Sequence, residues 1–143
     1  MRSLKTPAPA LLGATLLVFG LAACGSTVAT SNFKGEQHEV AQAISNLQSD
    51  VRAGEQTKVC ENDLAGPVVA RLGAAPGGCK QAIKGQLSEI DNFDVTVESA
   101  QITSSGSKRT ATARVKSTYN GKKVVRTVTL VFENGKWKIL NVA

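Results

Sequence analysis

The chain lacks the common sequence motifs of catalytic sites. It contains one histidine and no HExxH, GxSxG or glycine-rich phosphate-loop motif. Acid–base or nucleophilic catalysis needs a reactive group beside a positioned partner, and a metal site needs several ligands at suitable spacing. His38 stands in the first turn of a predicted helix, where we expect a surface position. The sequence therefore disfavours catalysis and predicts no metal and no cofactor.

The chain also lacks an apolar run long enough to form a transmembrane helix. Its longest run, Leu11–Leu21, is about half of the ~20 residues that span a bilayer. Arg2 and Lys5 precede this run, and the small residues Ala22 and Ala23 follow it. A positive start, an apolar centre and a small-residue cleavage point are the three parts of a secretory signal.

The end of this signal, Leu21-Ala22-Ala23-Cys24, resembles the lipobox of bacterial lipoproteins at all four positions. The resemblance implies cleavage after Ala23 and a diacylglyceryl thioether on Cys24, which becomes the new N-terminus. Two or more acyl chains hold a protein stably on a membrane. The alternative is an ordinary secretory signal with a cysteine that follows the cut by chance.

These features divide the chain into three parts. Residues 1–23 are the signal peptide, residues 24–35 a lipidated flexible tether of small and polar residues, and residues 36–143 one folded domain. The expected location is the extracytoplasmic side of the cell membrane, where nucleic acid is not an expected partner.

Cys60 and Cys79 remain as an even pair once Cys24 carries lipid. An oxidising compartment favours a disulfide between them. In the chain-entropy description, closing a loop of about 20 residues stabilises the fold by roughly 3 kcal/mol. A metal site would need more ligands than these two cysteines provide.

Acidic residues become rare toward the end of the chain. Residues 108–143 contain nine basic residues and one acidic residue, whereas residues 24–107 contain six basic and ten acidic residues. A basic face attracts anionic lipid, anionic wall polymer or an acidic protein. The alternative is a sheet face that is simply well solvated.

Apolar spacing of three and four residues predicts three helical segments in the first half of the domain. The first covers Glu36–Arg52. The second begins with Thr57–Leu64. Gly66-Pro67 then interrupts it, and a further turn or two is expected over Val68–Leu72. The third covers Cys79–Ile90, and it places Cys79 on the core side.

From Phe93 the apolar period changes to two, which predicts strands. A shift of parity in the first strand predicts a bulge near Ser99. Two Asn-Gly pairs, at Asn120 and Asn134, predict two-residue hairpin turns. The first turn places Val115 opposite Arg126 and Ala113 opposite Val128, and the second places Leu130 opposite Ile139 and Val128 opposite Asn141.

The two turns agree on the same apolar face of the sheet. That face comprises Ala111, Ala113, Val115, Val128, Leu130, Phe132, Trp137 and Ile139, and the opposite face comprises Thr110, Thr112, Arg114, Lys116, Lys123, Thr127, Thr129 and Lys138. We expect an α+β domain in which three helical segments cover the apolar face of a four-stranded antiparallel sheet.

This order of elements, together with the ending Phe132–Ile139, resembles the nuclear transport factor 2-like (cystatin-like) superfamily. The resemblance implies a cone in which a curved sheet wraps around helices. Cys60 and Cys79 also look like the cysteine pair of lipoprotein members. The superfamily includes ketosteroid-isomerase-like enzymes and many binding or assembly domains, so the fold alone does not decide the function.

The predicted register places four polar residues at one end of the inner face: Arg126, Asn141, Tyr119 and Ser117. Together they would form a pocket for an anionic or carbonyl-bearing ligand. Alternatively, this end projects past the helices into solvent. Trp137 is expected in the core, with an aromatic ligand platform as the alternative.

We expect a membrane-anchored, non-enzymatic binding domain whose partners are the membrane and an envelope protein or anionic envelope component. Two alternatives stay open. An enclosed cavity with an inward Asp, Glu or His would favour an isomerase-like enzyme. A filled cone with an exposed apolar patch would favour a structural assembly domain.

Overall fold

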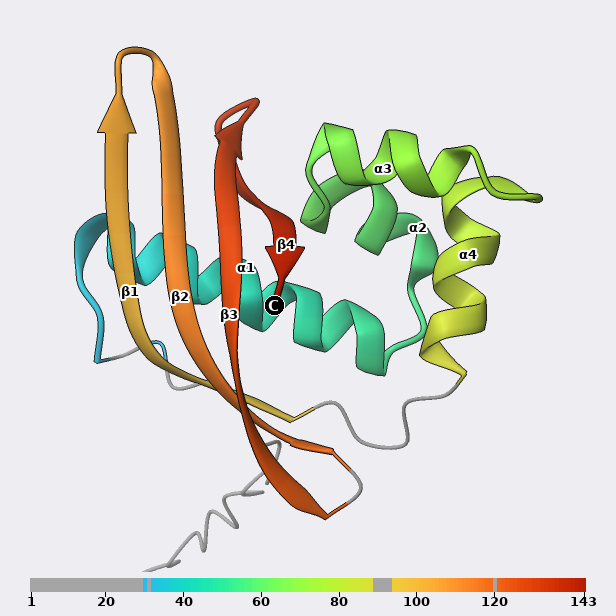
Figure 1. Ribbon diagram of the computed structural model, residues 1–143, viewed down its shortest axis with the longest axis horizontal. Helices are drawn as coiled ribbons and strands as arrows, with labels where there is room; N and C mark the ends of the chain where they lie inside the picture. Colours follow the sequence, from blue (N-terminus) through green and yellow to red (C-terminus); the bar gives the residue numbers. More distant parts are fainter. Residues whose placement is uncertain (1–29, 31, 89–93, 120) are drawn as a thin grey trace, which may run out of the picture.

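The structure is a computed structural model that describes residues 30, 32–88, 94–119 and 121–143. The predicted signal peptide, Cys24 and most of the predicted tether lie outside these residues, as do Ile90 and Phe93. Helices come first and strands second, as expected (Figure 1). The elements are α1 (Gly35–Arg52), α2 (Gln56–Lys58), a π-helical turn η1 (Val59–Asp63), α3 (Gly66–Gly73), α4 (Gly78–Leu87), β1 (Val95–Ser105), β2 (Lys108–Tyr119), β3 (Lys122–Glu133) and β4 (Lys136–Val142).

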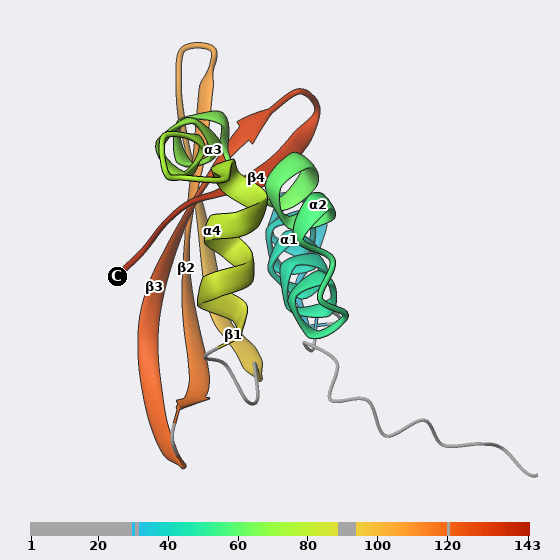
Figure 2. The ribbon, with the colours of Figure 1, turned by 90° about the vertical axis from the view of Figure 1, so that its right-hand side faces the viewer.

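The strands form one antiparallel sheet in the order β1-β2-β3-β4. The α+β class and the curved four-stranded sheet are confirmed. Figure 2 shows the sheet as one layer with α1 and α2 on one side of it. None of the helices in the described ranges is long and apolar enough to cross a membrane.

The helix α1 packs on the sheet through the predicted apolar stripe. Val40 and Ile44 are buried, and Leu47 and Val51 are partly buried against the same core. Near the start of the helix, Gln37 donates a side-chain hydrogen bond of 2.9 Å to the carbonyl oxygen of Ala100 in β1, an edge strand of the sheet. The helix therefore lies across the inner face rather than along one strand.

The second helical segment is interrupted, as predicted, but the break lies at Leu64-Ala65, and Gly66-Pro67 begin the next helix. α2 and η1 form one stretch that ends at Asp63, the backbone of Leu64 is extended, and α3 is a separate helix of eight residues. Pro67 stands in the first turn of α3, where its missing N–H breaks no helical hydrogen bond. The extended Leu64-Ala65 link lies beside β4, and the Ala65 N–H donates to the Ile139 carbonyl oxygen at 2.8 Å.

The register predicted from the first hairpin is confirmed, with Ala113 opposite Val128 and Val115 opposite Arg126. In the second hairpin Phe132 faces Trp137 and Leu130 faces Ile139, as predicted. The bulge predicted near Ser99 lies between Val97 and Ser99. The predicted inner face is buried except for Phe132, which is partly buried.

The predicted pairing of Val128 with Asn141 is wrong. Val128 faces Val142 and Thr129 faces Asn141, so Leu140 is an extra residue that forms a β-bulge. Leu140 lines a hollow between β4, α3 and α4, together with Leu64.

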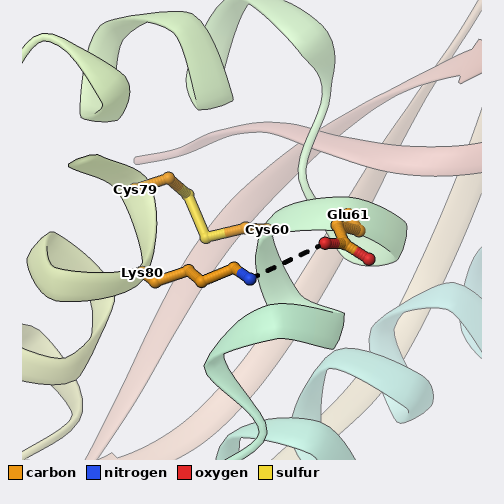
Figure 3. The surroundings of a disulfide bond; sticks show 4 residues. All are labelled: Cys60, Glu61, Cys79 and Lys80. Atoms are coloured by element: carbon orange, nitrogen blue, oxygen red, sulfur yellow. Dashed lines mark ion pairs between the residues drawn. A yellow bond between two sulfur atoms is a disulfide. The ribbon is translucent and has the colours of Figure 1, made fainter.

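The predicted disulfide joins Cys60 in η1 to Cys79 at the start of α4, with 6.3 Å between their Cα atoms (Figure 3). The next residue of each element adds an ion pair, in which the Lys80 ammonium lies 3.9 Å from the Glu61 carboxylate. The bond thus connects α4 to η1, which in turn packs on α1 and β4.

Candidate functional site

The four residues predicted to form a pocket do not converge. Arg126 and Asn141 are exposed, Ser117 is partly buried, and the side chain of Tyr119 lies outside the described part of the chain. The bulge at Leu140 also shifts Asn141 away from the inner face. The end of the β2–β3 ribbon projects past the helices (Figures 1 and 2), so the solvent-facing alternative describes Arg126 better.

A cavity of about 330 Å³ lies at the other end of the inner face. Its walls come from α1, from η1 and from the β3–β4 hairpin. The lining combines three apolar residues with seven polar or charged ones: Ala43, Phe132 and Trp137, and His38, Glu39, Gln42, Asn46, Asn62, Asp63 and Lys136. This volume fits a small molecule.

Asp63 is the most unusual residue of this cavity. It is only 6% exposed, and its Oδ2 atom has no hydrogen-bond partner among the described residues. Burial is the largest cause, followed by the charge of the neighbouring Asp50 carboxylate and a side-chain hydrogen bond with it, and together they raise the pKa of Asp63 from 3.8 to about 7. Lys138 and Lys136 oppose this shift. Near neutral pH, Asp63 therefore exists in both protonation states.

Trp137 supplies a second buried polar atom. The residue is 5% exposed, and its Nε1 atom has no hydrogen-bond partner within the described ranges. Its ring meets Phe132 edge to face, with 5.4 Å between the ring centroids. Trp137 is thus part of the core, as expected, and it also forms part of the cavity wall.

A charged pair lies against this aromatic wall. The Arg109 guanidinium is 4.2 Å from the centroid of the Phe132 ring and 5.4 Å from that of Trp137, and it forms an ion pair with Glu36. Such cation–π contacts hold the aromatic rings in place. This end of the inner face therefore combines two aromatic side chains with an ion pair.

His38 is partly buried at the cavity rather than fully exposed. Its Nδ1 atom lies 3.0 Å from the Thr30 carbonyl oxygen, the arrangement of an Nδ1–H donor. Within the described ranges, no group of three or more His, Cys, Asp or Glu side chains is suited to hold a metal ion. The polar side chains of the lining are suited to hydrogen bonding with a small organic molecule.

Two signals in the sequence could have revealed this site. Asp63 follows Val59 by four residues, so a helical period places its carboxyl on the same face as a buried valine. Arg109 precedes Ala111 by two residues, so strand alternation places it on the inner face. The cavity itself could not be predicted. Its walls come from the β3–β4 hairpin, α1 and η1, which are separate in the sequence, and local patterns do not show how they pack together.

Comparisons with known proteins give limited information. No protein-family model matches the chain, and no curated protein matches it. Among solved structures, a designed nuclear transport factor 2-like protein matches with 18% sequence identity and a TM-score of 0.43. The match covers 71% of this chain and 91% of the designed one. We base no functional argument on this similarity.

Proposed function

We propose that this chain is a lipid-anchored protein on the extracytoplasmic side of a bacterial membrane, with a domain that binds a small ligand without chemical change. The lipobox-like Leu21-Ala22-Ala23-Cys24 supports the anchor, and the Cys60–Cys79 disulfide fits an oxidising compartment.

The observation that carries the binding proposal is a cavity of about 330 Å³ whose lining includes Asp63 and Trp137, two residues that each have a buried polar atom, Oδ2 and Nε1. Buried polar groups in proteins nearly always have a partner, which is protein, water or ligand. Protonated Asp63 and the Trp137 N–H are both donors. They would suit a neutral molecule that carries a carbonyl or hydroxyl oxygen, while Phe132 and Ala43 contact its apolar part.

A second candidate is an isomerase-like enzyme, which one specific observation favours. A carboxyl group with a pKa of about 7 in a cavity has the properties of a general base. Asp63→Asn separates the two functions: asparagine can still donate a hydrogen bond, whereas it cannot abstract a proton. Retained ligand binding with no turnover by either form would support binding alone.

A structural assembly domain has less support. The large apolar side chains that are exposed in the described part of the chain are Val125 and Val142. Two such residues do not make the extended patch that a permanent interface requires.

The binding proposal predicts that filling the cavity abolishes binding. Trp137 is the only tryptophan of the chain and lines the cavity, so its fluorescence reports on ligands there. We expect some members of a panel of small neutral amides and hydroxy compounds to change this fluorescence. Ala43→Phe, which places a ring in the cavity, should weaken their binding at least tenfold.

The matched control is Ala70→Phe on the exposed side of α3, which should leave binding within twofold of the parent. Thermal unfolding of both variants shows whether they fold. If no compound binds, or if Ala43→Phe and Ala70→Phe bind equally well, the cavity is not a ligand site.

A further inference from the structure

The end of the β2–β3 ribbon carries a concentration of positive charge. Residues 114–126 contain five basic residues and no acidic one: Arg114, Lys116, Lys122, Lys123 and Arg126. Lys116, Lys122, Lys123 and Arg126 are all exposed. The far end of this ribbon extends past the helices (Figures 1 and 2), whereas Val115 at its base is buried in the core.

Two of the five cations already have a partner in the fold. Glu98 of β1 forms ion pairs with Arg114 at 3.2 Å and with Lys116 at 2.6 Å, and the hydrogen bond from Lys116 is the main cause that lowers the pKa of Glu98. Lys122, Lys123 and Arg126 make no ion pair with any described residue. We call these three residues the basic arm.

The basic arm combines charge with exposed apolar surface. Lys122 and Arg126 lie on one face of the ribbon and Lys123 on the other, because alternate residues of a strand point to opposite faces. By the same alternation Val125 lies on the face of Lys123, and it is 44% exposed. A bilayer interface accommodates this combination, since lysine and arginine contact anionic headgroups while an apolar side chain enters the acyl boundary.

We propose that the basic arm docks on anionic phospholipid headgroups of the membrane that carries the protein. The inference rests on the proposed anchor, which keeps the domain within reach of the bilayer. In Figure 1 the short segment before α1 (blue) descends toward the side on which the arm projects. Docking would give the domain a second contact with the membrane and thereby a fixed orientation, with the Asp63 cavity at the other end of the ribbon.

The test uses the chain from residue 24 with Cys24→Ala, so that no lipid anchor contributes to binding. Co-sedimentation is measured with vesicles of phosphatidylcholine alone and with vesicles that contain one third phosphatidylglycerol. We expect binding only to the anionic vesicles, and we expect it to weaken strongly when salt is raised from about 0.1 M to about 0.5 M.

Lys122→Glu with Lys123→Glu should weaken binding to anionic vesicles at least tenfold. The matched control is Lys80→Glu with Lys84→Glu on α4, which changes the net charge equally but lies outside the ribbon and should change binding less than threefold. Lys122→Gln with Lys123→Gln, which only removes charge, should be intermediate.

Failure of the parent to bind anionic vesicles would overturn docking on lipid and leave an acidic protein or wall polymer as the partner of the arm. Equal losses in the ribbon and α4 variants would assign the binding to net charge and would also overturn the proposal. Neither result would affect the proposed anchor, because the protein tested has none.

Discussion

Replacing both Cys60 and Cys79 with alanine is expected to lower the free energy of unfolding by about 3 kcal/mol, within a typical range of 2–5 kcal/mol. The disulfide closes a loop between residues 19 positions apart, so its loss gives the unfolded chain more conformations. It also joins η1 to α4, which otherwise contacts the domain through a small buried surface that includes Ile83. For a domain of this size, the midpoint of thermal unfolding should fall by roughly 10–15 °C.

Urea unfolding of the parent, the double variant and the parent in reducing agent measures this effect. Reduction should reproduce most of the loss without any change of side chain, which separates the bond from the packing of Cys60. Cys24→Ala is the matched single-cysteine control and should leave stability unchanged. If the double variant is within about 0.5 kcal/mol of the parent, the bond does not stabilise the fold as the chain-entropy description requires.

Asp63→Asn is expected to stabilise the protein at pH 8 and to have little effect at pH 4. The unfolded chain releases the Asp63 proton near pH 3.8, whereas the folded chain holds it until about pH 7. Between these values the folded state binds more protons than the unfolded state, so the stability of the parent falls as pH rises. Above pH 7 the folded state bears the full free-energy cost of a charged, buried Asp63. A tenfold change in a protonation equilibrium is worth about 1.4 kcal/mol, so this cost is at most about 4 kcal/mol.

Urea unfolding of the parent and the Asp63→Asn variant across pH 4–8 measures the difference directly. We expect the variant to gain about 2–4 kcal/mol relative to the parent at pH 8. Asp50→Asn removes the second cause of the raised pKa, so the fall in stability should end at a lower pH in that variant. An equal difference between Asp63→Asn and the parent at both ends of the range would mean that Asp63 is not held protonated in the folded state.

The antiparallel ribbon could be predicted well because local turn chemistry determines it. In the second hairpin Asn134 and Gly135 both have positive φ, at 51° and 76°, which is the conformation that an Asn-Gly turn provides. Once each turn is placed, the alternation of apolar residues leaves one register that buries Ala113 and Leu130 together. Two independent turns then support each other.

The parts that could not be predicted depend on contacts between distant elements. The bulge places Leu140 beside a hollow that residues of α3 and α4 also line, and alternation along β4 alone does not reveal it. It changed the place of Asn141 and so removed one member of the predicted pocket. The charge of Arg109 on the inner face is matched by Glu36 from α1, and this pairing depends on how the helix crosses the sheet.

The candidate site lies at the opposite end of the sheet from the predicted pocket, again because it depends on contacts between distant elements. The predicted site was chosen by the polarity of one sheet face, which identified Arg126 and Ser117. The cavity instead combines one sheet hairpin with two helical elements, and its key residue, Asp63, belongs to the π-helical turn. Strand alternation gives no information on such residues.

The most direct test is the intact mass of the protein purified from membranes without reduction, measured beside a Cys24→Ala form. We expect the mass of residues 24–143 with a diacylglyceryl group and with two hydrogens fewer, which reports the anchor and the Cys60–Cys79 disulfide together. The Cys24→Ala form should carry no lipid. A lipid-free mass for the parent would contradict membrane anchoring and make the protein a secreted domain, and two additional hydrogens would show that the disulfide does not form.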